Sequence, residues 1–545
     1  MKNKKFFYAA LLALPFALYS CDKDNNNGPV DEVQGGLVIK KDADAANIVK
    51  GILKTQSPGS GLSFLVESAS DAAVSFEGDD DAAGPLISRF DITGANEDYV
   101  GGQYNKHYVA IAQVNELLAI LDIIPAGAAA DGFILTVAGK NIALGGAYFA
   151  RAYSYFNLVQ LYGSVPIYTE VGETNGSRAS VDNVYKQIES DLLEAEKLLP
   201  TSTGVKTVPS KYAAQAILAK VYLTWAQYSD QGDLDATPAD QTKLAKAVTY
   251  ADKVIESGEF ILLDDFTKNW GRHNKNGREH IYNQSYVLGD ARSNDGGNHQ
   301  SHCAFSYGFD ANPNDQPAHI GPASYDLYTK WDNNNPQKDY DQRRDFSYAD
   351  HLLKPGTDSV YQFNPTTGWL PLFGKGIDRS FPNGAIDGPA ERDLDRIEIR
   401  YAEVLLIKAE ALIEQNQNLG VATDLINQVR DRAYKDALNT NYRIIASSQT
   451  DLRNALRQER ANEFVYEQKR WFDLVRWHVL EKTVLTVQNY PEYTASPAAG
   501  TFFAKVKKHL AERVAAVTGS GAKYYTFPIP DAAIESNPNL ATSHH

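Results

Sequence analysis

Charged residues near the C-terminal end of the chain are spaced in a way that could support chemistry. Four of them recur at intervals of four, four and three residues: Glu459, Glu463, Glu467 and Arg470. On one continuous helix these side chains would share a face. Two such carboxylates could form the acid pair of a glycosidase, which needs a set separation across a cleft. Alternatively, with Arg460, Asp473 and Arg476 they could form a partly buried ion network that fixes packing, and we expect the network.

Other catalytic signals are weak. The sequence has no G-x-S-x-G elbow, no H-E-x-x-H, no P-loop and no dinucleotide fingerprint. His299, His302 and Cys303 could offer three zinc ligands, but a structural zinc usually needs four. Residues 78–81 could hold a structural calcium through oxygen ligands, although a solvated acidic loop is the simpler interpretation. We therefore expect a protein that is not an enzyme and needs no cofactor.

The composition is that of an acidic globular protein. Of the 545 residues, 43% are hydrophobic and 22% are charged, which excludes a mainly disordered or collagen-like chain. The formal net charge is −15, and no basic run interrupts the acidic balance. A nucleic acid would be repelled by this charge, so we expect no nucleic-acid partner.

The N-terminal segment is typical of an exported lipoprotein. Three lysines precede an almost wholly apolar run at residues 6–19, which is too short to span a bilayer comfortably and indicates a signal peptide. The run ends in Leu-Tyr-Ser-Cys, which resembles a bacterial lipobox. We therefore expect a signal peptide over 1–20, and a lipidated Cys21 with a flexible tether over 21–36. A plain secretory signal with a chance cysteine is the alternative.

Helical periodicity dominates two parts of the chain. Apolar residues three and four apart predict helices at 108–121, 143–162, 182–199, 210–225, 244–255, 401–415, 421–433 and 451–477. Short links make each helix the natural packing partner of its neighbour, so we expect antiparallel hairpins. Helix starts recur at roughly 30 to 40 residues, close to the tetratricopeptide period.

Between the two helical parts the pattern changes. Gly, Pro, Asn and Asp are dense over 264–395 and apolar runs are short, which predicts loops with a few strands. We therefore divide the body of the chain into a helical part at 37–263, a loop-rich region at 264–395 and a C-terminal helical part at 396–545. The last part is expected to close on an extended, proline-rich tail at 524–540.

Several long motifs resemble those of the SusD/RagB family. Residues 400–411 read RYAEVLLIKAEA, and residues 426–433 are similar to the family's I-N-x-V-R-x-R-A. Residues 459–477 match E-R-x-x-E-x-x-x-E-x-x-R-x-x-D-L-x-R-W, and residues 151–166 resemble R-A-x-x-x-F-x-L-x-x-x-Y-G-x-V-P. The closing F-P-I-P and N-P-N-L, within 527–540, also resemble the family's tail. The similarity therefore spans nearly the whole chain.

The resemblance implies a mainly α, SusD-like fold, with tetratricopeptide-like helical hairpins and a loop-rich ligand face with a few short strands. Family members are lipid-anchored proteins of the outer membrane and cell surface. They capture oligosaccharides or polysaccharides for uptake and deliver them to a SusC-like TonB-dependent transporter, over which they form a lid. Capture of peptides with a RagA-like transporter is the alternative within the family. A further alternative is a scaffold that mainly docks the transporter.

The resemblance also places the ligand face in the loop before the first long helix and in the loops of the middle region. A sugar site needs aromatic planes together with amide, carboxylate or guanidinium groups. In and beside the first loop the candidates are Asp71, Arg89, Phe90, Asp91, Asn96 and Tyr99. In the middle region they are Cys303, Phe305, Tyr307, Phe309, Asn312, Trp369 and Arg379.

For both loops a structural role is the alternative. The first loop could fold back and bury Phe90. The middle rings alternate along the sequence, so as a strand they would show one face, which could equally be a packed sheet face. The first loop lacks the Trp found in the best-known starch-binding members of the family, so the comparison with them implies a glycan other than starch.

Overall fold

The structure is a computed structural model of the chain. It describes residues 39–57, 59–73, 83–90, 97–124, 126–127, 135–228, 239–271, 274–285, 327–328, 331, 335–349, 351–353, 360–362, 372–375, 395–445, 448–486, 497–518 and 525–541. The described part is mainly helical, with three short two-stranded sheets. This confirms the expected fold class.

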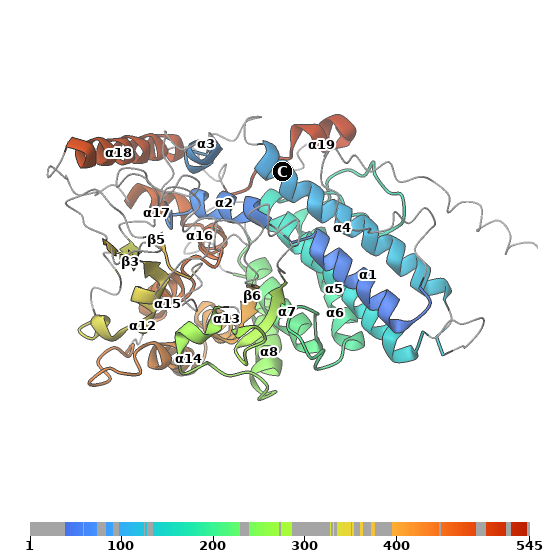
Figure 1. Ribbon diagram of the computed structural model, residues 1–545, viewed down its shortest axis with the longest axis horizontal. Helices are drawn as coiled ribbons and strands as arrows, with labels where there is room; N and C mark the ends of the chain where they lie inside the picture. The colour runs from blue at the N-terminus through green and yellow to red at the C-terminus, as the bar shows by residue number, and fades with distance from the viewer. Residues whose placement is uncertain are drawn as a thin grey trace, which may run out of the picture.

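Helices of the first part pack in sequence order as antiparallel hairpins. They are α1 (Asp42–Thr55), α4 (Glu97–Ile123), α5 (Val137–Tyr162), α6 (Val181–Leu198), α7 (Lys211–Ala226) and α8 (Gln241–Ile255). Each of α4 to α7 packs on the next helix along the chain, and Figure 1 shows α4, α5 and α6 lying side by side. The predicted helices of this part are confirmed. The stretches that form α1, α2 (Gly59–Ala69) and α3 (Ala83–Ser88) were not predicted.

Local sequence signals explain where these helices begin and end. The hydroxyl of Ser210 accepts from the backbone N–H of Ala213 at the start of α7, as its position before the apolar stripe predicts. Helix α5 ends at Gly163, whose φ of 69° is the left-handed conformation that a glycine adopts without strain.

Helix α1 fits closely against α5 because glycines open space for it. A Cβ on Gly146 would lie 2.7 Å from Cγ1 of Val49, and a Cβ on Gly139 would overlap the carboxylate of Asp42. That carboxylate accepts from both the backbone and the hydroxyl of Thr136, at 2.8 and 2.7 Å. The first helix after the predicted tether is therefore joined tightly to the helical stack.

Short strands and turns make up the described portion of the middle region. Strand β1 (His280–Gln284) pairs antiparallel with β6 (Arg396–Arg400), and both strands are buried. Two smaller antiparallel pairs join β2 (Tyr348–Ala349) to β5 (Leu372–Phe373), and β3 (His351–Leu353) to β4 (Val360–Gln362). The short helical segments are η2 (Phe266–Asn269), η4 (Lys338–Tyr340) and α12 (Gln342–Ser347).

The C-terminal part continues the helical stack and then crosses the molecule. Its helices are α13 (Tyr401–Glu414), α14 (Leu419–Ala433), α15 (Gln449–Glu463), α16 (Arg470–Arg476), α17 (Leu480–Thr486), α18 (Pro497–Val517) and α19 (Asp531–Ser536), followed by η7 (Pro538–Leu540). Helix α13 packs against α7 and α8. Figure 1 shows α18 beside α3 (Ala83–Ser88), close to α2 (Gly59–Ala69), so segments more than 400 residues apart lie side by side there.

Two expectations for this part are wrong. The predicted helix 451–477 is two helices, because the chain turns after Glu463: Tyr466 and Gln468 have φ values of 59° and 52°. The predicted extended tail contains α19 and η7, which begin after Pro530 and Asn537. Proline is well tolerated at the start of a helix, so proline in this tail marks helix starts as well as extended chain.

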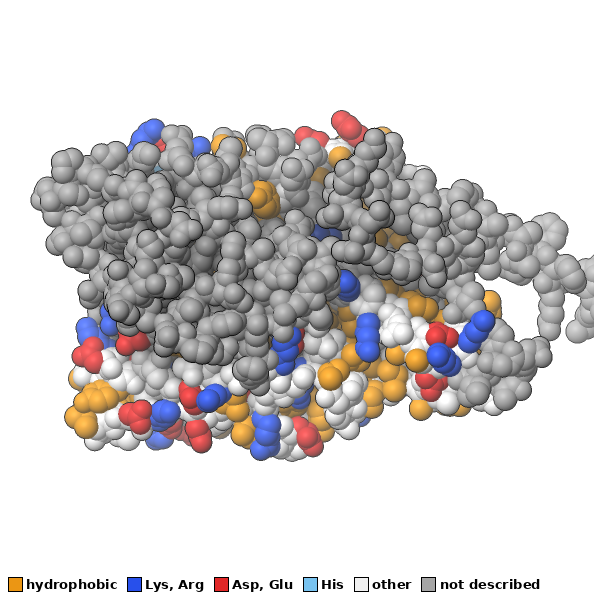
Figure 2. All heavy atoms as spheres, viewed as in Figure 1, with side chains coloured by type: hydrophobic (Ala, Val, Ile, Leu, Met, Phe, Trp, Pro, Cys, Tyr) orange, Lys and Arg blue, Asp and Glu red, His pale blue; other side chains and the backbone are white. Residues whose placement is uncertain are grey.

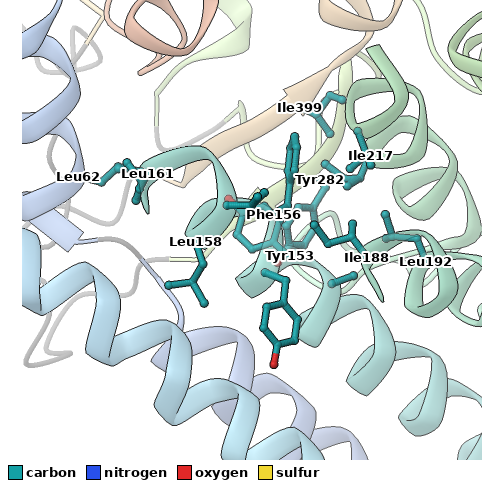
Figure 3. Packing of buried hydrophobic residues seen from close by; sticks show 14 of the residues in the cluster. Leu62, Tyr153, Phe156, Leu158, Leu161, Ile188, Leu192, Ile217, Tyr282 and Ile399 are labelled. Carbon is teal, nitrogen blue, oxygen red and sulfur yellow. The ribbon is translucent and has the colours of Figure 1, made fainter. Parts of the chain in front are cut away.

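One large hydrophobic core joins the ends of the sequence. It includes residues from Ile39 to Leu540, and rings from α5 and β1 lie within it. Figure 3 shows Tyr153 and Phe156 near Tyr282, whose ring centroid is 6.1 Å from that of Tyr153. Each large apolar side chain buried in this way contributes about 1.5–3 kcal/mol to folding. Among the described helices, none is both long enough and apolar enough to span a membrane.

Candidate functional site

Asp71, the candidate just after α2, is held by the C-terminal part. Its side chain is 5% exposed, and both carboxylate oxygens accept from the guanidinium of Arg470, at 2.7 and 2.8 Å. This parallel pair of hydrogen bonds fixes the geometry of both groups. The end of α2 is therefore fastened to the first turn of α16.

Arg89 and Phe90, which follow α3, contact α18. Arg89 donates to Oε2 of Glu512 at 3.1 Å. Phe90 has a φ of 60°, is half-buried against the main core, and has the guanidinium of Arg513 5.4 Å from its ring centroid. A cation at this distance over an aromatic face is attracted by the ring. The structure thus brings three predicted residues, Asp71, Arg89 and Phe90, to the α16–α18 side of the molecule.

The other predicted residues are placed differently. Tyr99 lies in the first turn of α4, half-buried against the main core. The remaining candidates lie outside the described residues: Asp91, Asn96, Cys303, Phe305, Tyr307, Phe309, Asn312, Trp369, Arg379 and the lipidation site Cys21. Contact of any of these side chains with a ligand stays a prediction.

Sequence reasoning missed the α18 residues that hold this region. His509 is buried with its Nε2 2.9 Å from the hydroxyl oxygen of Ser88, and Arg513 donates to the backbone carbonyl of Ala69 at 2.8 Å. Burial lowers the pKa of His509 to about 3, assisted by the charges of Arg513 and Arg89, so its imidazole is neutral. The i, i+3, i+4 spacing of His509, Glu512 and Arg513 is the one signal that could have indicated a shared polar face.

A buried ion network lies beneath the C-terminal signature. Its members come from distant segments and are all buried: Glu279, Asp341, Arg343, Lys375, Arg400, Arg430, Arg432, Glu459, Glu463 and Glu467. Arg400 donates to Glu279 at 2.7 Å and to Glu467 at 2.9 and 3.0 Å. Glu463 accepts from Arg343 at 2.9 Å and also from Arg432 and Arg400. The network therefore joins β6, α12, α14 and α15.

The expected ion network is confirmed, but its partners and geometry differ from those expected. Arg460, Asp473 and Arg476 form a second buried group, in which Asp473 accepts from both arginines at 2.8 to 2.9 Å. Arg476 donates in turn to Glu410 of α13 at 2.8 Å. The shared-face argument fails beyond Glu463, because the turn after that residue carries Glu467 and Arg470 away from α15.

The electrostatics of the network oppose acid catalysis. Burial raises the pKa of Glu463, but Arg432, Arg400 and Arg343 outweigh it and hold that pKa well below its ordinary value. Glu467 is also held low, through Arg400 and Lys375 acting against its burial. A general acid must carry a proton near its working pH, and these carboxylates do not.

Glu67, on α2, has the opposite character. Its side chain is 1% exposed, Oε1 accepts from the backbone N–H of Gln468 at 3.1 Å, and Oε2 has no hydrogen-bond partner among the described residues. Burial raises its pKa to about 8, the hydrogen bond from Gln468 opposes this, and repulsion from Asp71 adds to it. A neutral carboxyl group therefore lies at the junction between α2 and the turn at 464–468.

A small cavity marks where three parts of the sequence meet. Its volume is about 10 Å³, enough for roughly one water molecule, and it is lined by Ala72 after α2, by Leu327 and Tyr348 of the middle region, and by Tyr466 and Arg470 of the signature. Within the described ranges, no group of three or more His, Cys, Asp or Glu side chains is arranged to hold a metal ion. The calcium and zinc candidates of the sequence, at 78–81 and 299–303, lie outside those ranges.

The surface of the helical stack has mixed charge. Figure 2 shows acidic and basic side chains interspersed along the lower edge, where α8 and α14 lie. Lys246 pairs with Glu189 and Lys253 with Glu196, both at 2.7 Å. Such alternation is typical of a solvated face.

Comparisons with known proteins agree with this architecture. A family model described as "SusD family" matches residues 271–543, and a second, "Starch-binding associating with outer membrane", matches residues 65–223. Neither model describes a catalytic activity. SusD-like protein P2 of Formosa agariphila is 28% identical over 344 residues, which cover 61% of this chain and 64% of that protein. The match thus spans less than two thirds of that relative's length.

Solved structures extend the likeness to most of the chain. A SusD homologue from Bacteroides thetaiotaomicron superposes with a TM-score of 0.73 at 22% identity, covering 92% of this chain and 96% of that one. Another structure, determined with a xylogluco-oligosaccharide, has a TM-score of 0.68 at 18% identity and covers 92% and 98% of the two chains. At these identities the likeness establishes the fold. Together with the family model that matches half of the sequence, it shows that this chain belongs to the SusD family.

Proposed function

We propose that the chain is a lipid-anchored, cell-surface protein that binds oligosaccharide or polysaccharide and delivers it to a SusC-like TonB-dependent transporter of the outer membrane. The observation that carries this proposal is membership of the SusD family over 271–543, combined with the second family model over 65–223. A fold neighbour determined with a xylogluco-oligosaccharide supports a glycan ligand.

The fold supports binding rather than catalysis. The carboxylates that could have formed an acid pair lie in a buried network instead. Glu459, Glu463 and Glu467 are each paired with an arginine or a lysine. Of the candidate binding residues, Asp71, Arg89 and Phe90 follow α2 and α3, and α16 and α18 hold them through Arg470, Glu512 and Arg513. Rigid scaffolds that carry variable loops are the usual arrangement of binding proteins.

Calorimetric titration tests the ligand. The chain without its signal peptide is titrated with a xylogluco-oligosaccharide, fructan, α-glucan, xylan, mannan and pectic oligosaccharides, and with a peptide pool. We expect heat from one class of glycan. Heat from the peptide pool alone would refute the glycan assignment in favour of peptide capture. Silence from all of these ligands would favour a scaffold that mainly docks the transporter.

The predicted contacts are tested with substitutions that preserve volume, because Phe90 and Tyr99 also pack against the core. Tyr99→Phe and Asn96→Leu remove hydrogen-bonding groups, and we expect each to weaken glycan binding about tenfold if the group bonds a sugar hydroxyl. Tyr212→Phe, on α7, is the matched control outside the first loop. Equal affinity in all three variants would remove these two residues from the site.

The anchor and the transporter need separate experiments. Metabolic labelling with a radioactive fatty acid should label the wild-type chain and not Cys21→Ser. Affinity purification from the outer membrane of the host should recover a SusC-like transporter with the wild-type chain. Labelling of the Cys21→Ser variant, or recovery of no transporter, would refute the corresponding part of the proposal.

A further inference from the structure

The base of the first loop is held from one side by the C-terminal part of the chain. We define the loop base as residues 69–73, from the last residue of α2, and 88–90, from the last residue of α3. Each of these segments contacts residues that lie far away in the sequence, between 470 and 513. The residues in contact are not neighbours along the chain, so the contacts arise from the tertiary fold.

Three residues on one face of α18 make most of the contacts, and we name them the α18 clamp: His509, Glu512 and Arg513. His509 reaches Ser88, Glu512 accepts from Arg89, and Arg513 donates to the carbonyl of Ala69. Contacts to both segments of the loop base from adjacent turns of one helix fix the spacing between those segments.

Arg513 is the central member. It is 3% exposed, it bonds the last residue of α2, and its guanidinium lies over Phe90, which is in a left-handed conformation. Burying a guanidinium costs free energy unless it is hydrogen-bonded or paired, and the bond to Ala69 and the ring of Phe90 offset part of that cost for Arg513. A left-handed non-glycine residue persists only where its surroundings hold it, and here α18 supplies part of that surrounding.

We propose that the α18 clamp positions the loop base, so that the candidate ligand contacts Arg89 and Phe90 are held in a binding-competent arrangement before a ligand arrives. This inference rests on the proposed function, because it concerns the same binding site. The clamp residues act through Ala69, Ser88, Arg89 and Phe90, and they are positioning residues rather than ligand contacts.

The proposal has a kinetic signature. If loss of the clamp leaves only a fraction of molecules competent to bind, the apparent Kd rises by the inverse of that fraction. Association then slows by the same factor while dissociation from the bound state is unchanged. Loss of a direct ligand contact does the reverse, since most interface substitutions act on dissociation.

Two clamp variants and a matched control separate these cases. Arg513→Met removes the charge and the hydrogen bond to Ala69 while keeping an apolar stem, and Glu512→Gln is milder because Glu512 is 36% exposed. The control is Arg453→Met, the same substitution at an arginine whose ion pair, with Glu414, joins α13 and α15 rather than the loop base. Arg513→Lys keeps a charged donor and should restore part of the loss.

Hydrogen exchange of the ligand-free protein is measured first. We expect amides of 69–73 and 88–90 to exchange about tenfold faster in Arg513→Met, the lower end of what loss of a charged hydrogen bond produces. Amides of α13 and α14 should be unchanged. Arg453→Met should leave the loop base unchanged. Unchanged exchange at the loop base in both clamp variants would overturn the proposal, and if Arg513→Met does not fold, Glu512→Gln decides this comparison.

Binding kinetics are measured second, with the glycan that binds in calorimetry, or with the peptide pool if no glycan binds. Slower association with unchanged dissociation in the clamp variants supports positioning. Unchanged association, or faster dissociation alone, overturns it. Absence of glycan binding by the wild-type chain refutes the proposed glycan function separately, because the exchange experiment and the peptide arm do not depend on it.

Discussion

Replacement of Glu67 by Gln should change how the stability of this protein depends on pH. In the folded chain burial raises the pKa of Glu67 from 4.5 to about 8, whereas an unfolded chain returns it to its ordinary value. A folded-state pKa that is raised favours the protonated group. The stabilisation that the neutral Glu67 side chain gives to the folded state is therefore fully present below about pH 4.5 and is lost as the pH rises through 8.

The magnitude follows from the same two pKa values. At 1.36 kcal/mol for each pH unit, the interval from 4.5 to 8 corresponds to a loss of roughly 4 to 5 kcal/mol. Gln fits the site, because its carbonyl can accept from the backbone N–H of Gln468 as Oε1 of Glu67 does. Glu67→Gln should thus equal the wild type in stability near pH 4.5 and exceed it increasingly up to pH 8.

Urea unfolding at half-unit pH intervals from 4.5 to 8.5 provides the assay. In the difference in free energy of unfolding between Glu67→Gln and wild type, the contributions of the other titrating groups cancel. Glu116→Gln is a control, since Glu116 is a half-exposed carboxyl on α4 whose pKa is raised by partial burial alone. The change with pH in the unfolding free-energy difference between Glu116→Gln and wild type should be much smaller. A Glu67→Gln difference that stays constant with pH would refute the reasoning, because it would mean that the carboxyl titrates alike in both states.

Three further predictions concern the scaffold. Glu463→Gln should lower the free energy of unfolding at pH 7 by about 3–5 kcal/mol, because it leaves buried arginines short of a counter-charge; denaturant unfolding that shows a loss below 1 kcal/mol would contradict this. Burial lowers the pKa of His107 to about 3, so the stabilisation that its neutral imidazole gives to the fold is present above pH 6.5 and is lost as the pH falls. Relative to His107→Gln, the free energy of unfolding of the wild type should fall by roughly 3 kcal/mol by pH 4. Parallel curves of unfolding free energy against pH for the two proteins would contradict this. Gly146→Ala should lower Tm and reduce the free energy of unfolding by about 1–3 kcal/mol, because the added methyl group overlaps Val49. A second substitution, Val49→Ala, should recover part of that loss, and no recovery would contradict the overlap.

Local sequence signals predicted the elements whose stability is decided within a few residues. The apolar spacing of 210–225 and the serine before it specify α7 and its cap, because both depend on neighbours within one or two helical turns. The same argument failed at the turn after Glu463. The charged pattern of 459–470 suits a continuous helix, yet tertiary pairing of Glu467 with Arg400 and Lys375 accompanies a break.

The candidate site was only partly accessible to this reasoning. Asp71, Arg89 and Phe90 were chosen as residues of a ligand loop, and the structure adds that α16 and α18 hold them. Nothing in the local sequence around α2 indicates a partner 399 positions away, as Arg470 is from Asp71. Such pairings depend on how helices cross in space, which hydrophobic periodicity does not encode.

The sequence by itself determined the family, the helical hairpins and the expectation of a lipidated N-terminus, because motifs, apolar periodicity and a lipobox-like segment are all contiguous in the chain. Only the tertiary structure decided which charges pair, where the long charged helix breaks and which helix supports the first loop. Those features arise from contacts between segments hundreds of residues apart, and their energies come from burial and from the exclusion of water, which exist only once the chain has folded.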